Sequence, residues 1–284
     1  MARELANVTG ASRYLIPGFE ILRQTASGGF STIYKAWDET RQIVVALKVL
    51  NEVGGKLAAF LDEGEDTRWE GEIAMSLKHP NIIQTYECGK KGGRYYLAME
   101  YISCVKAKYL CPVESPRELA DRLRILMQVV EALTYVHDKG LLYRDVCVGN
   151  VLVDRKLTAK LIDFGLTVPK AQGSVYHGKA GTPSYMAPEM IRTEQADERT
   201  DIYSFGVLMY EFLTGKKPFK AEDKFSRMVR SLNVNPAPMT RFSPSVSPQL
   251  QAIVSRAMEK ETRRRYQSMS EVRNALLALT QTHP

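Results

Sequence analysis

Residues 141–165 read LLYRDVCVGNVLVDRKLTAKLIDFG, and this stretch decides the fold. A polar loop carries Asp145 and Asn150, and two short apolar runs separated by a turn lead from it to Asp163. Apolar runs of this length, bounded by polar turns, are typical of strands. Two acids and an amide at strand ends supply the hard oxygen ligands that a phosphate-bound divalent cation needs, and one carboxylate remains for an attacking hydroxyl. The stretch therefore predicts a metal-assisted phosphate site.

The motifs in and around this stretch resemble those of protein kinases. The signature H-R-D-L-x-x-x-N matches residues 143–150, with Tyr143 in the histidine position, and D-F-G matches residues 163–165. The segment GTPSYMAPE at residues 181–189 is a longer match, and it is similar to serine/threonine kinases rather than tyrosine kinases. The resemblance runs from about residue 19 to residue 279 and looks like the bacterial kinases of the eukaryotic (Hanks) type.

This resemblance implies an α+β, two-lobed kinase fold, with a small lobe of antiparallel strands plus a helix and a mostly α-helical large lobe. We expect a flexible N-terminal extension at 1–18, the small lobe at 19–101 and the large lobe at 102–280. In the large lobe, helical periodicity over residues 118–140 ends at Gly140, a good C-terminal cap. The resemblance also implies a buried central helix over residues 201–212 and an ion pair between Arg265 and Glu189.

The other expected elements follow from local patterns. A strand begins at residues 19–22, and a strand, a tight glycine turn and a second strand occupy residues 25–36. Further strands are expected at residues 41–50, 82–87 and 94–101, with a basic glycine turn at 89–93, and a helix within 58–78. Residues 103–117 and the segment from 166 to 181 read as irregular or loop-like.

The glycine turn resembles the loop that covers the ATP phosphates in kinases. A glycine at 28 lets backbone amides approach phosphate oxygens with no Cβ in the way. Two other family glycines are replaced, by Ala26 and Ser31, so we expect a stiffer loop and weaker ATP binding. The loop residues expected at the nucleotide are Thr25, Ala26, Ser27, Gly28, Gly29, Phe30, Ser31, Thr32 and Ile33.

Lys48 interrupts an otherwise apolar strand, and a buried lysine is costly unless it is paired. The segment resembles the V-A-I-K motif, whose lysine holds the α- and β-phosphates. The family spacing to the H-P-N motif selects Glu70 as its partner, with Glu72 as the nearby alternative. By the same resemblance, Met99 is the gatekeeper, and the other residues expected around the base are Ala46, Glu100, Ile102 and Leu152.

The resemblance assigns roles to the remaining motif residues. Asn150 and Asp163 hold Mg²⁺, for which Mn²⁺ is an alternative, and Asp145 orients the acceptor hydroxyl, while Thr182 shapes the acceptor platform. Cys147 stands where serine/threonine kinases carry a lysine that offsets charge on the transferring phosphoryl group. Losing such an electrostatic donor costs on the order of 10²–10³ in rate.

Two further readings stay open. The thiol of Cys147 is either inert or a redox sensor, and the adjacent Asp145 disfavours its thiolate. Arg144 either receives a phosphate from the following loop, where Ser174 and Tyr176 are candidate sites, or that loop is merely polar. Lys179 is a candidate to replace the missing catalytic-loop lysine.

The composition fits a globular enzyme: of 284 residues, 44% are hydrophobic and 25% charged. We expect no transmembrane segment or signal peptide, and four cysteines without metal or disulfide spacing indicate a cytoplasmic location. The net charge of +7 is scattered, which favours solvated faces over nucleic-acid binding.

The expected partners are ATP and a protein with a serine or threonine acceptor, the chain itself included, and the oligomeric state is not indicated. The alternatives are a nucleotide-binding pseudokinase scaffold and a small-molecule kinase, which the match at residues 181–189 disfavours.

Overall fold

The computed structural model describes residues 15–56, 70–113, 115–170 and 181–281. Most of the N-terminal extension, residues 58–69 of the expected helix, and Ser174, Tyr176 and Lys179 lie outside the described residues. The chain divides into two compact units, the smaller comprising Met1–Lys78 and Gln84–Ile102 and the larger His79–Ile83 and Ser103–Pro284.

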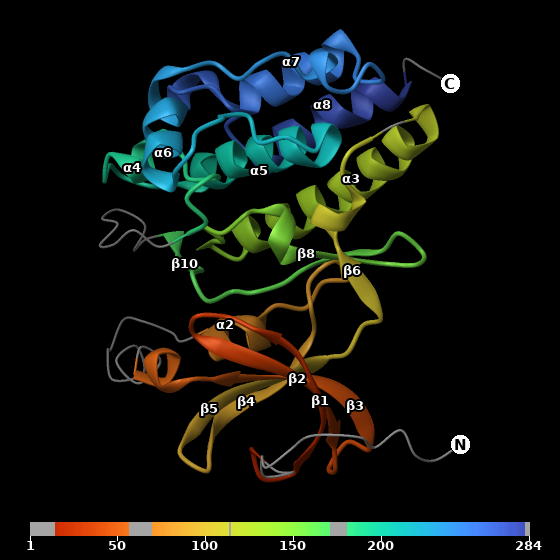
Figure 1. The fold of residues 1–284 in the computed structure, drawn as a ribbon, viewed down its shortest axis with the longest axis vertical. Coiled ribbons are helices and arrows are strands. Elements are labelled where there is room, and N and C mark those ends of the chain that lie inside the picture. Colours follow the sequence, from red (N-terminus) through yellow and green to blue (C-terminus); the bar gives the residue numbers. More distant parts are fainter. Residues whose placement is uncertain (1–14, 57–69, 114, 171–180, 282–284) are drawn as a thin grey trace. The chain divides into compact units, whose positions relative to one another are not determined.

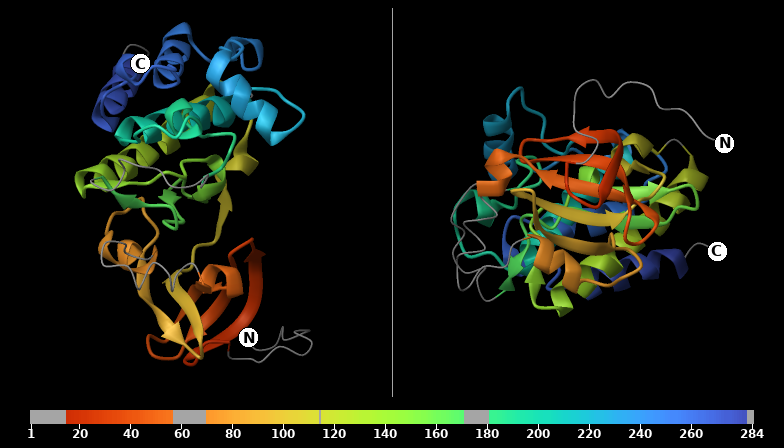
Figure 2. Two further views of the ribbon diagram at one scale, coloured as in Figure 1. Left: turned by 90° about the vertical axis from the view of Figure 1, so that its left-hand side faces the viewer. Right: turned by 90° about the horizontal axis from the view of Figure 1, so that it is seen from below.

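The smaller unit is built on one antiparallel sheet with the strand order β1-β2-β3-β5-β4 (Figures 1 and 2). Its strands are β1 (Phe19–Ser27), β2 (Ser31–Asp38), β3 (Ile43–Leu50), β4 (Thr85–Lys91) and β5 (Arg94–Glu100). The helix α2 (Glu70–Ser76) packs against β4. The predicted strand–turn–strand at residues 25–36 and the predicted strand around Lys48 are both present.

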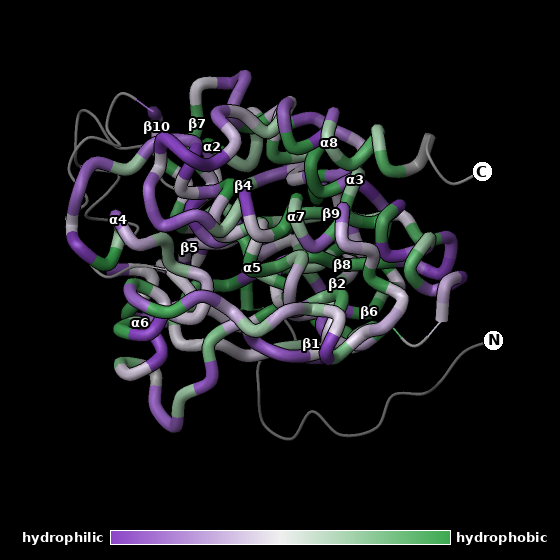
Figure 3. Tube along the Cα trace, turned by 90° about the horizontal axis from the view of Figure 1, so that it is seen from above, coloured by the Kyte–Doolittle hydropathy of each residue, from purple (hydrophilic) through white to green (hydrophobic). Residues whose placement is uncertain are grey.

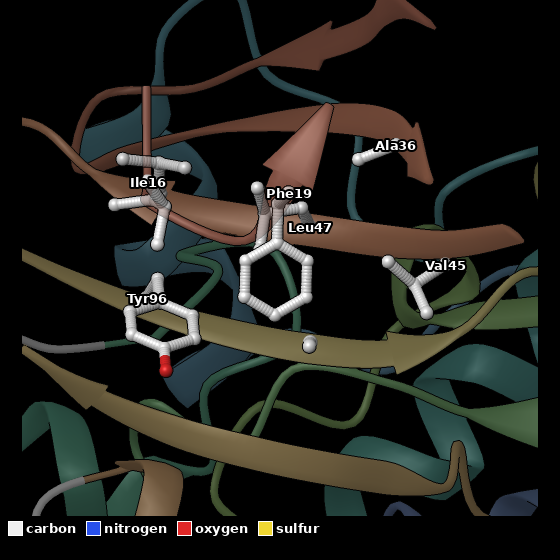
Figure 4. Close-up of a cluster of buried hydrophobic side chains, with 8 residues drawn as sticks. Ile16, Phe19, Ala36, Val45, Leu47 and Tyr96 are labelled. Atoms are coloured by element: carbon white, nitrogen blue, oxygen red, sulfur yellow. The ribbon is translucent and has the colours of Figure 1, made fainter. Parts of the chain in front are cut away.

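One face of this sheet carries a compact apolar core (Figure 4). Val45 and Leu47 alternate along β3 and point into it, as the two-residue period of a strand requires. The rings of Phe19 on β1 and Tyr96 on β5 lie 5.5 Å apart in a tilted arrangement. Burial of these side chains joins the first strand to the middle of the sheet.

The hairpin of β4 and β5 corrects two expectations. The strand predicted at residues 82–87 runs over Thr85–Lys91 instead, and the turn predicted at 89–93 narrows to Gly92 and Gly93. Both glycines have positive φ, at 56° and 75°, as a two-residue hairpin turn requires. Ile82 pairs in the larger unit, in a parallel bridge with Leu161.

The larger unit is mostly helical. Its helices are α3 (Pro116–Asp138), α4 (Pro188–Ile191), α5 (Glu198–Thr214), α6 (Lys224–Asn233), α7 (Pro248–Ala257) and α8 (Met269–Gln281). Short 3₁₀ turns are η1 (Ala107–Leu110), η2 (Val148–Asn150), η4 (Met239–Arg241) and η5 (Thr262–Arg264). Two small sheets are formed by β6 (Cys104–Lys106), β8 (Val151–Asp154) and β9 (Ala159–Leu161), and by β7 (Leu141–Leu142) and β10 (Val168–Pro169).

The helix α3 has a clear start and stop. Ser115 and Glu118 form a reciprocal capping box, with Pro116 in the first turn. Gly140 follows the last turn with φ of 74°, a left-handed conformation that glycine adopts without strain, so the predicted C-terminal cap is present.

The helix α5 is the buried centre of the larger unit, as predicted, and it packs against α3 and α7. Figure 3 shows the apolar residues of this unit gathered inside and the polar residues in its outer turns. A Cβ on Gly206 would stand 2.7 Å from Met258 Cγ and 3.0 Å from Ala257 Cβ, so glycine is required for the close approach of α7.

Two stretches expected to be irregular contain strands. Within residues 103–117, β6 pairs with β8, and Arg122 then holds the following turn by donating to Leu110 O. Within residues 166–181, β10 pairs with β7. These strands have only two or three residues, so no periodicity could reveal them. Among the described residues, no helix is both long and apolar enough to cross a membrane.

Candidate active site

The candidate residues are spread over the two units, and those of each unit are described separately. In the smaller unit, Lys48 Nζ lies 2.5 Å from Glu70 Oε1, and the two side chains are only 10% and 13% exposed. A lysine on a central strand is tolerated there because the carboxylate of α2 neutralises it. The predicted pairing with Glu70 is therefore present, whereas the alternative, Glu72, is exposed. The pair fixes an ammonium group next to the sheet, where it can meet a phosphate.

The glycine turn between β1 and β2 is braced from both sides. Gly28 N donates to Ser31 O at 2.8 Å, and Thr25 Oγ1 donates to Ile33 O at 3.0 Å. Ser27 and Thr32 hydroxyls face each other at 3.4 Å. A Cβ on Gly28 would meet only Ser31 O, at an ordinary 3.7 Å. The described fold therefore does not require glycine at 28, whereas a ligand approaching the backbone would.

A second contact holds the tip of this turn, and sequence reasoning missed it. Asn51, just after β3, donates from Nδ2 to Gly29 O at 2.6 Å and from its backbone to Phe30 O at 2.9 Å. Its Oδ1 accepts from Gly54 N at 2.9 Å, three residues on, as the side chain of a helix N-cap does. A Cβ on Gly54 would stand 2.2 Å from Phe30 O, so only glycine permits this approach. The Asn-x-x-Gly spacing was the available signal.

The residues expected near the base lie at the end of the same sheet. Ala46 on β3 is paired with Met99 on β5, and β5 ends at Glu100. Glu100 N already donates to Gln84 O at 2.9 Å. The backbone amide of Glu100 is therefore occupied within the smaller unit. The other predicted residue, Leu152, lies on β8 of the larger unit.

In the larger unit, Asp201 organises the catalytic loop. This fully buried carboxylate of α5 accepts from Tyr143 N at 2.8 Å and from Arg144 N at 2.7 Å. Its Oδ2 also lies 2.8 Å from His137 Nε2. Arg144 has a left-handed φ of 70°, which these bonds help to hold. Sequence reasoning missed the roles of Asp201 and His137, because their partners are more than 50 residues away along the chain.

Asp145, Asn150 and Thr182 form one hydrogen-bonded group. Asp145 Oδ1 accepts from Thr182 Oγ1 at 2.7 Å and from Thr182 N at 3.0 Å, and its Oδ2 accepts from Asn150 Nδ2 at 2.6 Å. The carboxylate is thus oriented by the acceptor segment and by the end of the catalytic loop. Such a held carboxylate can direct a hydroxyl for attack.

Asn150 and Asp163 stand at one end of the β8–β9 hairpin. Val151 pairs with Leu161, and Ile162 N donates to Asn150 O at 3.0 Å. The Asn150 side chain donates both of these hydrogen bonds, to Asp145 O and Asp145 Oδ2, from Nδ2, so Oδ1 is the atom that could ligate a cation. Asp163 has a left-handed φ of 67°, uncommon outside glycine and tolerated by aspartate.

These donors fit Mg²⁺ carried by a polyphosphate. No group of three or more His, Cys, Asp or Glu side chains among the described residues could hold a metal by itself. Mg²⁺ typically takes one or two protein oxygens and completes its shell with phosphates and water.

Tyr143 replaces the family histidine and is completely buried. Its ring packs edge-on against Phe164, with centroids 5.3 Å apart, and its hydroxyl donates to Ile162 O. Burial, followed by the neighbouring carboxylates Asp145 and Asp163, raises the pKa of this phenol well above its usual range. The neutral phenol therefore ties the catalytic loop to the segment before Asp163.

Cys147 is buried beside this group. Its Sγ lies 3.8 Å from Thr182 Oγ1. Burial and the nearby Asp145 raise the pKa of the thiol to about 11. A neutral thiol supplies no positive charge to a transferring phosphoryl group, and it lacks the electropositive surroundings of reactive cysteines.

The acceptor segment is anchored by a buried ion pair. Arg265 Nη1 and Nη2 lie 2.6 Å and 2.7 Å from the two carboxylate oxygens of Glu189, as predicted. Thr200 Oγ1 and the carbonyls of Arg199 and Glu259 complete the network. This bidentate geometry offsets the desolvation of both charges.

The two-unit fold and these paired motifs define a class of protein. A sequence model of the protein kinase domain matches residues 19–276, and the chain belongs to this family, so its fold is the α+β two-lobed kinase fold.

The chain is similar to curated bacterial proteins, of which three are described. Serine/threonine-protein kinase PrkC of Bacillus subtilis (strain 168) is 29% identical over 89% of this chain and 39% of its own length. Serine/threonine-protein kinase PknB of Mycolicibacterium smegmatis is 30% identical over 93% of this chain and 43% of its own. PknB of Mycobacterium tuberculosis (strain H37Rv) is 29% identical over 95% of this chain and 44% of its own. The chain thus spans about two fifths of the length of these relatives.

Proposed function

We propose that the chain transfers the γ-phosphate of ATP to serine or threonine residues of proteins, itself included. The observation that carries this proposal is the group formed by Asp145, Asn150 and Thr182, which orients one carboxylate toward an acceptor hydroxyl. The family and its serine/threonine-kinase relatives support the acceptor type.

We assign the remaining roles from chemistry. Lys48, held by Glu70, neutralises ATP phosphates, and the residues next to Gly28 offer backbone amides to them. Asn150 and Asp163 hold Mg²⁺, or Mn²⁺ in its place, and the bound metal neutralises charge that develops on the phosphates. The adenine base of ATP is contacted by Met99, Glu100 and Ile102.

Asp145 acts on the hydroxyl group that receives the phosphate. Its carboxylate accepts the proton of the serine or threonine hydroxyl while Thr182 keeps it in place. Cys147 adds no charge at this point, so the rate is expected to be on the order of 10²–10³ lower than with a lysine there. The four free cysteines among the described residues support a reducing, cytoplasmic setting.

The alternative is a nucleotide-binding scaffold with little transfer activity. The neutral, buried thiol of Cys147 and the replaced glycines at Ala26 and Ser31 favour it. The two functions separate in one experiment, in which labelled ATP and magnesium are supplied to the wild type and to Asp163→Ala, with the chain itself and a generic basic protein as acceptors.

Label on serine or threonine that disappears in Asp163→Ala supports the kinase, and Cys147→Lys should then raise the rate. ATP binding by the wild type without any transfer would establish the scaffold and contradict the kinase.

A further inference from the structure

A basic pocket lies in the larger unit, outside the site described above. It is a hollow of about 270 Å³ formed by the loop after α5, the end of α6 and the turn η4. Four cations line it: Lys217, Lys220, Arg230 and Arg241. No aspartate or glutamate lines it. Two other pockets of this unit differ, because each mixes acidic and basic side chains.

These four cations are not neutralised by the rest of the described chain. None of them forms an ion pair with a carboxylate within residues 15–56, 70–113, 115–170 and 181–281. Lys220 and Arg241 lie over the ring of Phe242, at 5.7 Å and 5.9 Å from its centroid. Uncompensated like charges around a concave surface focus a positive potential and draw anions to it.

The walls of the pocket are apolar. Phe219 and Tyr210 are buried behind it, and Val234 is 40% exposed at its rim. Figure 3 shows polar and apolar residues interspersed along α6, which forms one side. Such a surface suits a side chain with an apolar stem and an anionic head. A planar guanidinium adds bidentate recognition of a carboxylate.

The pocket lies next to the acceptor segment. Lys217 Nζ is 5.3 Å from the ring centroid of Tyr185, which belongs to residues 181–189. The hydroxyl of Tyr185 is engaged by Glu211 at 2.6 Å, so this acid is occupied and does not line the pocket. Helix α4, at the end of the acceptor segment, also contacts α6 (Figure 1). A polypeptide bound at the acceptor segment can therefore continue into the pocket.

We infer that the basic pocket binds an acidic, glutamate- or aspartate-rich segment of the protein substrate, at a distance along its chain from the phosphorylated residue. That the bound protein is a substrate rests on the proposed function. That the bound segment is acidic rests on charge complementarity with the pocket. A single-stranded nucleic acid is a poorer match, because its bases stack on exposed aromatic rings, and two of the three rings that line the pocket, Phe219 and Tyr210, are buried.

The test is peptide binding without ATP, followed by fluorescence anisotropy. The probe is a labelled glutamate-rich peptide, and the same peptide with glutamine in place of glutamate is its control. The double variant Lys220→Gln/Arg241→Gln should weaken binding of the acidic peptide about tenfold, since two charge-assisted contacts are lost. The matched control is Arg155→Gln/Lys156→Gln, which removes two exposed cations from the turn between β8 and β9.

Each outcome decides the inference. Weakened binding in the pocket variant alone, together with weaker binding of the wild type at higher salt, supports it. No binding of the acidic peptide, equal loss in both double variants, or binding of polyuridylate but not of the peptide overturns it. Because binding is read without phosphate transfer, an inactive enzyme that still binds the peptide refutes the proposed function and leaves the pocket standing.

Discussion

A single hydroxyl at Tyr143 joins the catalytic loop to the backbone before Asp163, and it can be removed without changing the ring. In Tyr143→Phe the ring still packs on Phe164, but Ile162 O loses its donor in a buried place. An unsatisfied buried carbonyl costs about 1–3 kcal/mol, so we expect the free energy of unfolding to fall by that amount in chemical denaturation. The control is Tyr109→Phe, whose side chain is exposed. Equal stability of Tyr143→Phe and the wild type would show that the bond contributes nothing.

The thiol of Cys147 should respond to pH unlike an ordinary cysteine. Burial and Asp145 raise its pKa to about 11, from an ordinary value of 9.0, so the neutral thiol persists further into the alkaline range. Only the thiolate reacts, and we therefore expect alkylation of folded Cys147 to stay slow near pH 8 and to rise as the pH approaches 11. Peptide-resolved mass spectrometry measures this, with the denatured chain as reference. Alkylation at neutral pH as fast as in the denatured chain would favour the redox-sensor reading instead.

At the scale of elements, the glycine turn depends on the residues that follow β3. Asn51 holds both Gly29 O and Phe30 O. In Asn51→Ala the side-chain bond is lost and the tip is released, so we expect faster amide hydrogen exchange over residues 28–31. The matched control is Glu52→Ala, whose side chain is 83% exposed and pairs only with the exposed Lys56. Unchanged exchange in Asn51→Ala would mean that the turn is held by its own cross-strand bonds.

Some of these helices and strands could be predicted from the sequence, and others could not. Lys48 and Glu70 could be paired because motif spacing fixes one strand and one helix. The extent of β4 could not be predicted, since its polar end, through Lys91, joins the ladder only because Gly92 and Gly93 form the turn. Strands as short as β6 and β10 exist through their partners, so local pattern carries no signal for them.

Long-range polar contacts escaped prediction for a similar reason. Asp201 and Asn51 each bind backbone atoms that no motif marks. Only the folded chain brings those atoms within reach. The ion pair of Arg265 with Glu189 was predictable because both ends lie in motifs that the resemblance supplied.

At the scale of the whole molecule, this ion pair links the acceptor segment to the approach to α8, 76 residues later. Replacing Arg265 by leucine leaves the Glu189 carboxylate buried without a counter-charge, which costs about 3–5 kcal/mol. We expect a correspondingly lower free energy of unfolding for Arg265→Leu in denaturant titration. The double variant Arg265→Leu/Glu189→Leu should recover part of the loss, because no charge is then stranded. A double variant less stable than the single one would contradict this account.

In the proposed function, the carboxylate of Asp145, held by Thr182 and Asn150, directs phosphate transfer to a hydroxyl. The most direct test is the initial rate of labelled phosphate transfer from magnesium-ATP to serine or threonine, compared between the wild type and Asp145→Asn. We expect measurable transfer by the wild type and a loss on the order of 10²-fold or more in Asp145→Asn, with ATP binding unchanged. Equal rates in the two proteins, or no transfer by a wild type that binds ATP, would contradict it.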